Sequence, residues 1–363
     1  MWTYYNPVDV HAGRGSLAAL PRLLGDRRAI LIAFPEASAL GLVDRIRGLL
    51  GDRLAAVETD VRPNPDVAWL APMYERLWRD HADAECIVAL GGGSVIDCAK
   101  VMLTRTANGH FGELQALLEG APPQPSSAQG HRRLLAVPTT AGTGSEVTPW
   151  ATVWDQARVR KLSLQLPWTW PEAALIDAEL MLSQPYSVTL ASGLDALSHA
   201  LESLWNVHRN PVSASLAISA IRSILATLPR LLAQPERCDL RESLATAALQ
   251  AGLAFSNTRT ALAHSLSYDI TLQHGTPHGI ACSFSLPRIL ALAAGHDAEL
   301  DTLLLSAFGV RHIDEAVAAL SAFLQGLGVS VDPQSYGIAE GDWSDRVAQA
   351  LAGARGRNFI AAA

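Results

Sequence analysis

Four side chains with metal-binding chemistry are the most informative feature of this sequence. Asp195 and His199 are four residues apart, and on a helix this spacing places both side chains on one face, one turn apart. Residues 192–204 have the composition of such a helix. His264 and His278 would complete a set of three imidazoles and one carboxylate. Such a set suits a divalent transition metal and does not suit calcium or magnesium.

The residues around His278 favour a metal site over a simpler interpretation. An Asp/His pair at helical spacing is more often a solvated helix face or a helix-stabilising hydrogen bond. Gly275 and Pro277 interrupt any helix between His274 and His278. A His held in such a turn has little conformational freedom, as a metal ligand requires. We therefore expect Asp195, His199, His264 and His278 to act together.

A glycine-rich turn predicts a phosphate contact. Residues 86–90 read as a buried strand, and Gly91, Gly92, Gly93 and Ser94 join it to a helix. Glycines allow close approach of the backbone, and a helix N-terminus offers free N–H groups. The pattern is neither GxGxxG nor a P-loop, so a tight strand-to-helix turn remains an alternative. Asp97, in the first turn of the helix, either stabilises the helix dipole or binds a ribose or amide of a cofactor.

A second loop reinforces the first. Residues 138–148 follow another predicted strand and concentrate glycines and hydroxyls, which suit phosphate and nicotinamide contacts. Lys161 follows and is placed to neutralise a pyrophosphate. Two such loops in one α/β domain favour dinucleotide binding. The candidate cofactor-binding residues are Asn64, Gly92, Gly93, Ser94, Asp97, Thr139, Thr140, Thr143, Ser145 and Lys161.

The elements that must position these residues fall into two domains. Strands and helices alternate in the first half, which predicts a parallel sheet with helices on both faces. Residues 121–130 read as a loop within it. After about residue 186, strand signals fade and Ala/Leu-rich helical periodicity continues to about residue 327. We predict an α/β dinucleotide-binding domain over residues 1–184 and an all-α metal-binding domain over residues 185–363. The predicted strands are 28–34, 54–61, 86–90 and 134–138, and the predicted helices are 39–50, 66–82 and one from residue 95.

The composition restricts the class of protein. The chain has 363 residues, of which 49% are hydrophobic, and a net charge of -7, which argues against nucleic-acid binding. Its four cysteines lack CxxC spacing and read as reduced thiols of a cytoplasmic protein. The N-terminus does not resemble a signal peptide, and no apolar run reaches the length of a transmembrane helix, so no membrane association is expected.

These motifs jointly resemble one known family. Residues 91–100 resemble the GGGSxxDxAK motif of iron-containing (group III) alcohol dehydrogenases, and residues 138–148 match their PTTAGTGSEVT segment. Residues 193–202 resemble their GxDAxxHAxE motif, and residues 277–279 their PHG. The resemblance implies an iron-containing alcohol dehydrogenase fold, shared with dehydroquinate synthase, with metal and nicotinamide meeting in a cleft. It also implies Fe²⁺ or Zn²⁺ as the metal, NAD as the cofactor, a small aldehyde or alcohol as substrate and a homodimer.

The sequence departs from the family pattern at two positions. Many members carry HxxxH before the PHG, and Tyr268 replaces the second His here. His264 keeps the ligand position, and Tyr268 is either a proton relay or a packing aromatic beside the metal. Members restricted to NAD usually have Asp after the first strand, where Glu36 lies in this chain. We expect NAD, and NADP remains an alternative.

One segment indicates a branch of the family. Residues 260–268, with Asn6 and Pro7, are similar to a phosphonate-associated branch that includes phosphonoacetaldehyde reductases, which make 2-hydroxyethylphosphonate. A phosphonate would need a cation, and Arg259 and His208 are the candidates by position. The alternatives are a short-chain alcohol or 1,3-propanediol dehydrogenase, a maleylacetate reductase and, from another class, a dehydroquinate synthase-like lyase.

Overall fold

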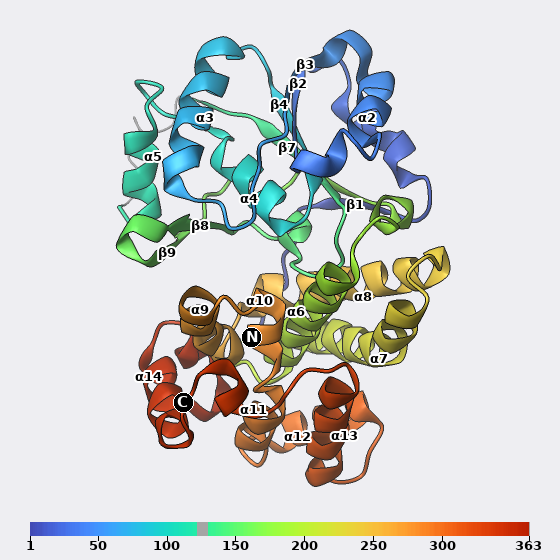
Figure 1. Ribbon diagram of the computed structural model, residues 1–363, viewed down its shortest axis with the longest axis vertical. Coiled ribbons are helices and arrows are strands. Elements are labelled where there is room, and N and C mark those ends of the chain that lie inside the picture. The colour runs from blue at the N-terminus through green and yellow to red at the C-terminus, as the bar shows by residue number, and fades with distance from the viewer. Residues whose placement is uncertain (122–129, 363) are drawn as a thin grey trace. The chain divides into compact units, whose positions relative to one another are not determined.

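The computed structural model describes residues 1–121 and 130–362 (Figure 1) and divides into two compact units. The α/β unit comprises Pro7–Thr140 and Ser145–Ser183. The helical unit comprises Met1–Asn6, Ala141–Gly144 and Gln184–Ala363. Two short segments within the first half of the sequence therefore pack with the helical unit, which a single boundary between residues 184 and 185 does not describe.

A six-stranded parallel sheet forms the centre of the α/β unit, as the alternation of elements predicts. At one edge of the sheet, β1 (Asp9–Ala12) pairs with β10 (Ala173–Ile176), which lies far along the chain. The strands lie in the order β1 (Asp9–Ala12), β10 (Ala173–Ile176), β7 (Arg133–Pro138), β4 (Cys86–Gly91), β2 (Ala29–Ala33) and β3 (Leu54–Glu58). Gly91 at the end of β4 pairs with Pro138 at the end of β7. The two loops singled out in the sequence therefore start side by side.

Alternating residues of the buried strands pack into two separate cores. In β2, Ile30 and Ile32 belong to a core with residues of α3 (Val67–Asp80), α4 (Gly93–Val101) and α5 (Phe111–Leu118). The intervening Leu31 belongs to a second core, which residues of α1 (Leu20–Leu24) and α2 (Leu42–Leu50) complete. Since successive side chains of a strand point to opposite faces, helices on both sides are required to bury β2.

Two small antiparallel pairs extend the α/β unit. β8 (Ala151–Asp155) pairs with β9 (Arg160–Leu164), and β5 (Thr104–Arg105) pairs with β6 (Gly130–His131). The predicted loop over residues 121–130 lies for the most part outside the described residues.

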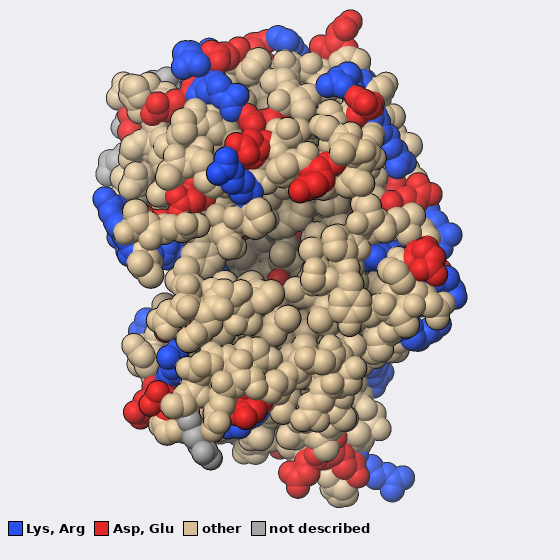
Figure 2. All heavy atoms as spheres, viewed as in Figure 1, with Lys and Arg blue, Asp and Glu red and all other residues tan. Residues whose placement is uncertain are grey.

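Acidic and basic side chains are interspersed on the face drawn in Figure 2, in line with ion pairs such as those between Arg62 and Asp60 and between Arg79 and Asp80.

The helical unit is built around three long helices that pack against one another (Figure 1). These are α6 (Tyr186–Leu204), α7 (Pro211–Ala233) and α8 (Cys238–Thr258). Shorter helices follow them along the chain. They are α9 (Leu262–His274), α10 (His278–Ser283), α11 (Leu286–Ala293), α12 (Ala298–Phe308), α13 (Ile313–Gly326) and α14 (Trp343–Ala352).

The sequence analysis expects no segment of transmembrane length, but helix α7 meets that criterion. By length and composition alone, α7 is long and apolar enough to cross a membrane, with a mean hydropathy of 1.5. Ile221, Ile224 and Leu228 on its buried face are fully inaccessible to solvent, and α7 packs against α6 and α8. A helix in the core of a protein passes the same test of length and composition.

Candidate metal centre

Helix α6 presents three ionisable side chains on one buried face. Asp195, His199 and Glu202 are separated by four and three residues, which places them in line along the helix. Their exposed fractions are 4%, 5% and 0%. Charged and titratable groups are rarely buried to this extent unless they are paired or bind a metal.

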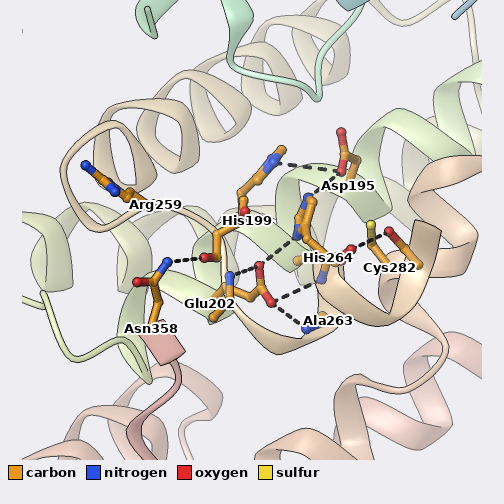
Figure 3. A network of polar contacts seen from close by, with 12 residues as sticks. Asp195, His199, Glu202, Arg259, Ala263, His264, Cys282 and Asn358 are labelled. Atoms are coloured by element: carbon orange, nitrogen blue, oxygen red, sulfur yellow. Dashed lines mark hydrogen bonds and ion pairs between the residues drawn. The ribbon is translucent and has the colours of Figure 1, made fainter. Parts of the chain in front are cut away.

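Donor atoms converge on the Asp195 carboxylate (Figure 3). Its Oδ1 lies 3.4 Å from Nε2 of His264 on α9 and 3.9 Å from Nε2 of His199. It also lies 4.0 Å from Nε2 of His278 on α10. Among the described residues, Asp195 Oδ1, His264 Nε2 and His199 Nδ1 are buried without a hydrogen-bond partner. Buried polar atoms without partners are costly, and a divalent cation coordinated by Asp195 Oδ1 and His264 Nε2 would remove that cost for these two atoms.

Glu202 fixes the orientation of His264. Its Oε2 lies 2.7 Å from His264 Nδ1, and its carboxylate also accepts hydrogen bonds from the backbone N–H groups of Ala261, Ala263 and His264 (Figure 3). With Nδ1 held by Glu202, the opposite atom, Nε2, faces Asp195. A carboxylate behind a ligating His is the usual arrangement around protein-bound metals.

The electrostatics of the cluster suit a cation. Burial lowers the pKa of His199 to about 4, so this imidazole is neutral at neutral pH and can donate a lone pair. Burial opposes ionisation of Asp195 and Glu202, yet the neighbouring imidazoles hold the pKa of each carboxyl below its usual value. Both carboxylates therefore carry negative charge inside the helical unit.

We expect Glu202→Gln to weaken metal binding about 10- to 100-fold, the usual cost of losing an outer-shell partner. The Gln amide accepts hydrogen bonds only through its one oxygen, and its NH₂ group would face the backbone N–H donors that the Glu202 carboxylate now satisfies. Metal content after equilibration with graded chelator measures the effect. Glu236→Gln, at an exposed position of the same unit, is the control, and equal metal retention by both variants would contradict the role of Glu202.

A close approach of two helices places His278. It is the first residue of α10, and the adjacent Gly279 lies directly against α6. A Cβ atom at Gly279 would lie 1.8 Å from the backbone oxygen of Ala191, one turn before Asp195, and 3.2 Å from Asp195 Cβ. Only glycine allows the two backbones to approach so closely, which explains the glycine that follows His278.

Cys282 is a potential donor that the sequence analysis did not identify. Its Sγ lies 3.6 Å from His278 Nε2, one helical turn along α10. The ligand atoms of Asp195, His264, His278 and Cys282 all lie within 4.8 Å of one another, a set that does not include His199. The ring of His199 instead stacks between Phe255 and His264, with centroid distances of 4.0 and 4.5 Å. Spacing of four residues from His278 was the available signal for Cys282.

Three further residues that the sequence analysis singled out do not belong to the cluster of donor atoms around Asp195. Tyr268 is half-buried on α9, and its ring is nearly parallel to that of His278 at a centroid distance of 6.5 Å. Arg259 and His208, the candidate phosphonate-binding cations, are both exposed. Arg259 ends α8 with a left-handed φ of 68°, and its side chain points away from Asp195, His199 and His264 (Figure 3).

The glycine turn of the α/β unit is suited to a phosphate. Gly92 caps the N-terminus of α4, and no side chain among the described residues caps it, so its first N–H groups remain available. A Cβ at Gly92 would lie 3.1 Å from Cγ2 of Thr140 in the neighbouring loop. Ser94 Oγ accepts a hydrogen bond from the backbone of Asn64. Gly92, Gly93, Ser94, Asn64, Thr139 and Thr140 thus gather around the ends of β4 and β7.

The other candidate cofactor residues are occupied within the protein or lie elsewhere. The Asp97 carboxylate accepts from Ser145 Oγ and from the backbone N–H of Thr152. The buried Lys100 donates to the backbone oxygens of Ser145 and Trp150, and to Ser145 Oγ. Lys161 lies over the ring of Trp154. Asp97 and Ser145 therefore brace the α/β unit, and Thr143 belongs to the segment that packs in the helical unit.

Two family models match nearly the whole sequence. The model of iron-containing alcohol dehydrogenases matches residues 7–178, and that of the C-terminal part of the Fe-containing alcohol dehydrogenase family matches residues 189–362. The chain belongs to the iron-containing alcohol dehydrogenase family. It is therefore an oxidoreductase, and the predicted α/β plus helical fold of this family is confirmed.

Members of the family with different substrates are similar to this chain. NAD-dependent methanol dehydrogenase of Bacillus methanolicus is 28% identical over 94% of this chain and 91% of its own length. Phosphonoacetaldehyde reductase of Streptomyces viridochromogenes is 34% identical over 67% of this chain and 61% of its own length. The crystal structure of sulfoacetaldehyde reductase from Bifidobacterium kashiwanohense in complex with NAD⁺ has a TM-score of 0.89 and 26% identity, covering 99% of this chain and 94% of that one.

Proposed function

We propose that this oxidoreductase reduces small aldehydes with NADH at a metal held by Asp195, His199, His264 and His278, and that phosphonoacetaldehyde is its preferred substrate. The observation that carries the proposal is the 3.4 Å approach of His264 Nε2 to Asp195 Oδ1. Both atoms are buried without a hydrogen-bond partner among the described residues. The similarity to phosphonoacetaldehyde reductase supports the substrate. Fe²⁺ is the metal that the family description favours, although the same ligands bind Zn²⁺ more tightly at equilibrium.

In this reaction the aldehyde carbon gains a hydride from NADH and its oxygen gains a proton. When bound, the metal supplies a Lewis acid that polarises the carbonyl oxygen. Asp195 would contribute the negative charge that holds the metal, and Glu202, by accepting the Nδ1 proton of His264, would leave the lone pair of Nε2 for the metal. We assign Tyr268 to the wall of the site beside His278.

The proposed cofactor is NAD, bound by the glycine turn after β4 and the hydroxyl-rich loop after β7. The NAD⁺ complex of the similar sulfoacetaldehyde reductase supports this choice. Glu36 is exposed just after β2, where a carboxylate would repel the 2′-phosphate of NADP. A comparison of NADH and NADPH at equal concentration tests the preference, and faster oxidation of NADPH would contradict it.

We expect the Fe²⁺-loaded protein to oxidise NADH at least about tenfold faster with phosphonoacetaldehyde than with propionaldehyde at equal, sub-saturating concentrations. A pocket that binds a charged group discriminates strongly against a ligand that lacks it. Nicotinamide absorbance measures both rates. Equal rates would indicate a general short-chain alcohol dehydrogenase, and turnover with no net change in absorbance would favour the dehydroquinate synthase-like lyase.

A further inference from the structure

We propose that Arg355 binds the anionic end of the substrate, a tetrahedral oxyanion such as a phosphonate or sulfonate carried by a short aldehyde. The proposal rests on the proposed function, because it assigns the specificity of the same site. Arg355 lies between α14 and a short 3₁₀ helix, Gly356–Asn358, in a stretch of sequence without a recognisable motif.

The guanidinium group of Arg355 is half-buried, and it forms no hydrogen bond or ion pair with the residues that the structure describes. Among the described residues, its one close interaction is with the ring of Tyr268, whose centroid lies 4.7 Å from Arg355 Cζ. Guanidinium groups carry five N–H donors. The buried Arg132 and Arg241 each donate to several oxygens of the protein, whereas Arg355 retains its donors for another acceptor.

The charge of Glu202 acts on Arg355, but among the described residues the two side chains form no ion pair. Burial lowers its pKa and the charge of Glu202 opposes that shift, so the two groups sense each other. The Glu202 carboxylate, however, is already engaged by His264 and by backbone N–H groups of α9. Compared with the part of the chain that the structure describes, an anion brought by a ligand would therefore be the first direct counter-charge for Arg355.

The ring of Tyr268 lies beside both Arg355 and the proposed metal ligand His278. Tyr268 lies one helical turn after His264 on α9, and its ring faces Arg355 while also pairing with the ring of His278. An aldehyde oxygen near the metal and an oxyanion near Arg355 would thus belong to opposite ends of one small molecule. Arg259, the candidate from the sequence, is exposed and points away from the cluster (Figure 3).

The chemistry of the guanidinium group selects the class of ligand. Its planar fork donates two parallel hydrogen bonds to a phosphonate or sulfonate, and such charge-assisted pairs are strong where water is excluded. Two relatives of the chain have names that describe two-carbon aldehydes carrying such an oxyanion, phosphonoacetaldehyde and sulfoacetaldehyde. Neither name assigns a residue to the recognition of the anion.

The test compares Arg355→Gln and Arg355→Lys with the wild-type holoenzyme on phosphonoacetaldehyde, sulfoacetaldehyde and propionaldehyde. We expect Arg355→Gln to raise KM for the phosphonate substrate about 100-fold, the usual result of removing one partner of a buried charge pair. The rate with propionaldehyde should stay within about twofold. Arg355→Lys should show an intermediate loss because it keeps the charge without the fork. Comparison of the rates with sulfoacetaldehyde and phosphonoacetaldehyde shows which oxyanion the wild-type enzyme prefers.

Binding of methylphosphonate, measured by calorimetry, provides a readout that does not require turnover. Wild-type protein should bind it and Arg355→Gln should not. The control is Arg288→Gln, since Arg288 also lies over an aromatic ring, that of Trp343, but is exposed on α11. Equal losses with all three aldehydes, or equal methylphosphonate binding by wild type and Arg355→Gln, would overturn the proposal. Wild-type protein that binds methylphosphonate but reduces no aldehyde would refute the proposed function and leave the anion site standing.

Discussion

His264→Ala is expected to remove both the metal and the activity of the enzyme. The substitution deletes an Nε2 donor 3.4 Å from Asp195 Oδ1 and leaves the buried Glu202 carboxylate without its imidazole partner. Loss of a Lewis acid that stabilises the developing charge should lower kcat/KM about 10³-fold or more. Metal analysis after gel filtration and the rate of NADH oxidation measure the two effects separately.

Two controls make this experiment decisive about the ligand set. His208→Ala removes an exposed imidazole of the same unit and should retain full metal. Cys282→Ser replaces the thiol that lies within 4.8 Å of the other donors, and with three imidazoles and Asp195 as ligands it should retain metal as well. Full metal stoichiometry in His264→Ala would refute the assignment of His264, and metal loss in Cys282→Ser would place the thiol among the ligands.

Gly279→Ala is expected to destabilise the protein and to displace His278. The new methyl group would lie 1.8 Å from the backbone oxygen of Ala191, and a backbone atom cannot move aside as a flexible side chain can. Overpacking of this kind costs about 3 kcal/mol or more when a helix must shift. Since α10 carries His278, the shift should also weaken metal binding. Denaturant unfolding and metal content measure the two consequences.

A second glycine provides the matched control for this effect. Gly326 ends α13, and a Cβ there would meet no atom of the described residues within 4 Å. Gly326→Ala should therefore leave stability unchanged or raise it by up to about 1 kcal/mol, because alanine favours the helix. If Gly279→Ala unfolded at the same denaturant concentration as Gly326→Ala and held full metal, the close approach of α6 and α10 would not be needed to place His278.

The buried centre of the fold could be predicted from local sequence patterns. The run of apolar residues over 28–34 predicts a strand that the structure has at Ala29–Ala33, and residues 86–90 correspond to β4 at Cys86–Gly91. Both strands are buried on two faces, which requires such runs. The edge strand β1 has only four residues and is partly exposed. Its pairing with β10 joins distant parts of the chain, so no local pattern predicts it.

At the candidate site too, local sequence patterns predict the arrangement of neighbouring residues but not the contacts between distant segments. The helical spacing of Asp195 and His199 predicts a shared face, and the structure places both on the buried face of α6. Glu202 also lies within the recognised motif, but its role depends on contacts with α9. Arg355 contacts Tyr268 across a long stretch of chain, and that its guanidinium group bonds to no acceptor among the described residues becomes apparent only in the folded structure.

The interleaving of the two units in the sequence restricts how this enzyme can be dissected. A fragment that begins at Gln184 keeps all nine helices from α6 to α14 that the structure describes, yet it lacks Met1–Asn6 and Ala141–Gly144. It would lose the reciprocal hydrogen bonds between Tyr5 and Asn257 on α8, and also Gly142, whose Cβ position lies 2.6 Å from the backbone of Ser192. Expression as two halves should therefore yield a helical half with an incomplete core, and the intact chain is the appropriate starting material.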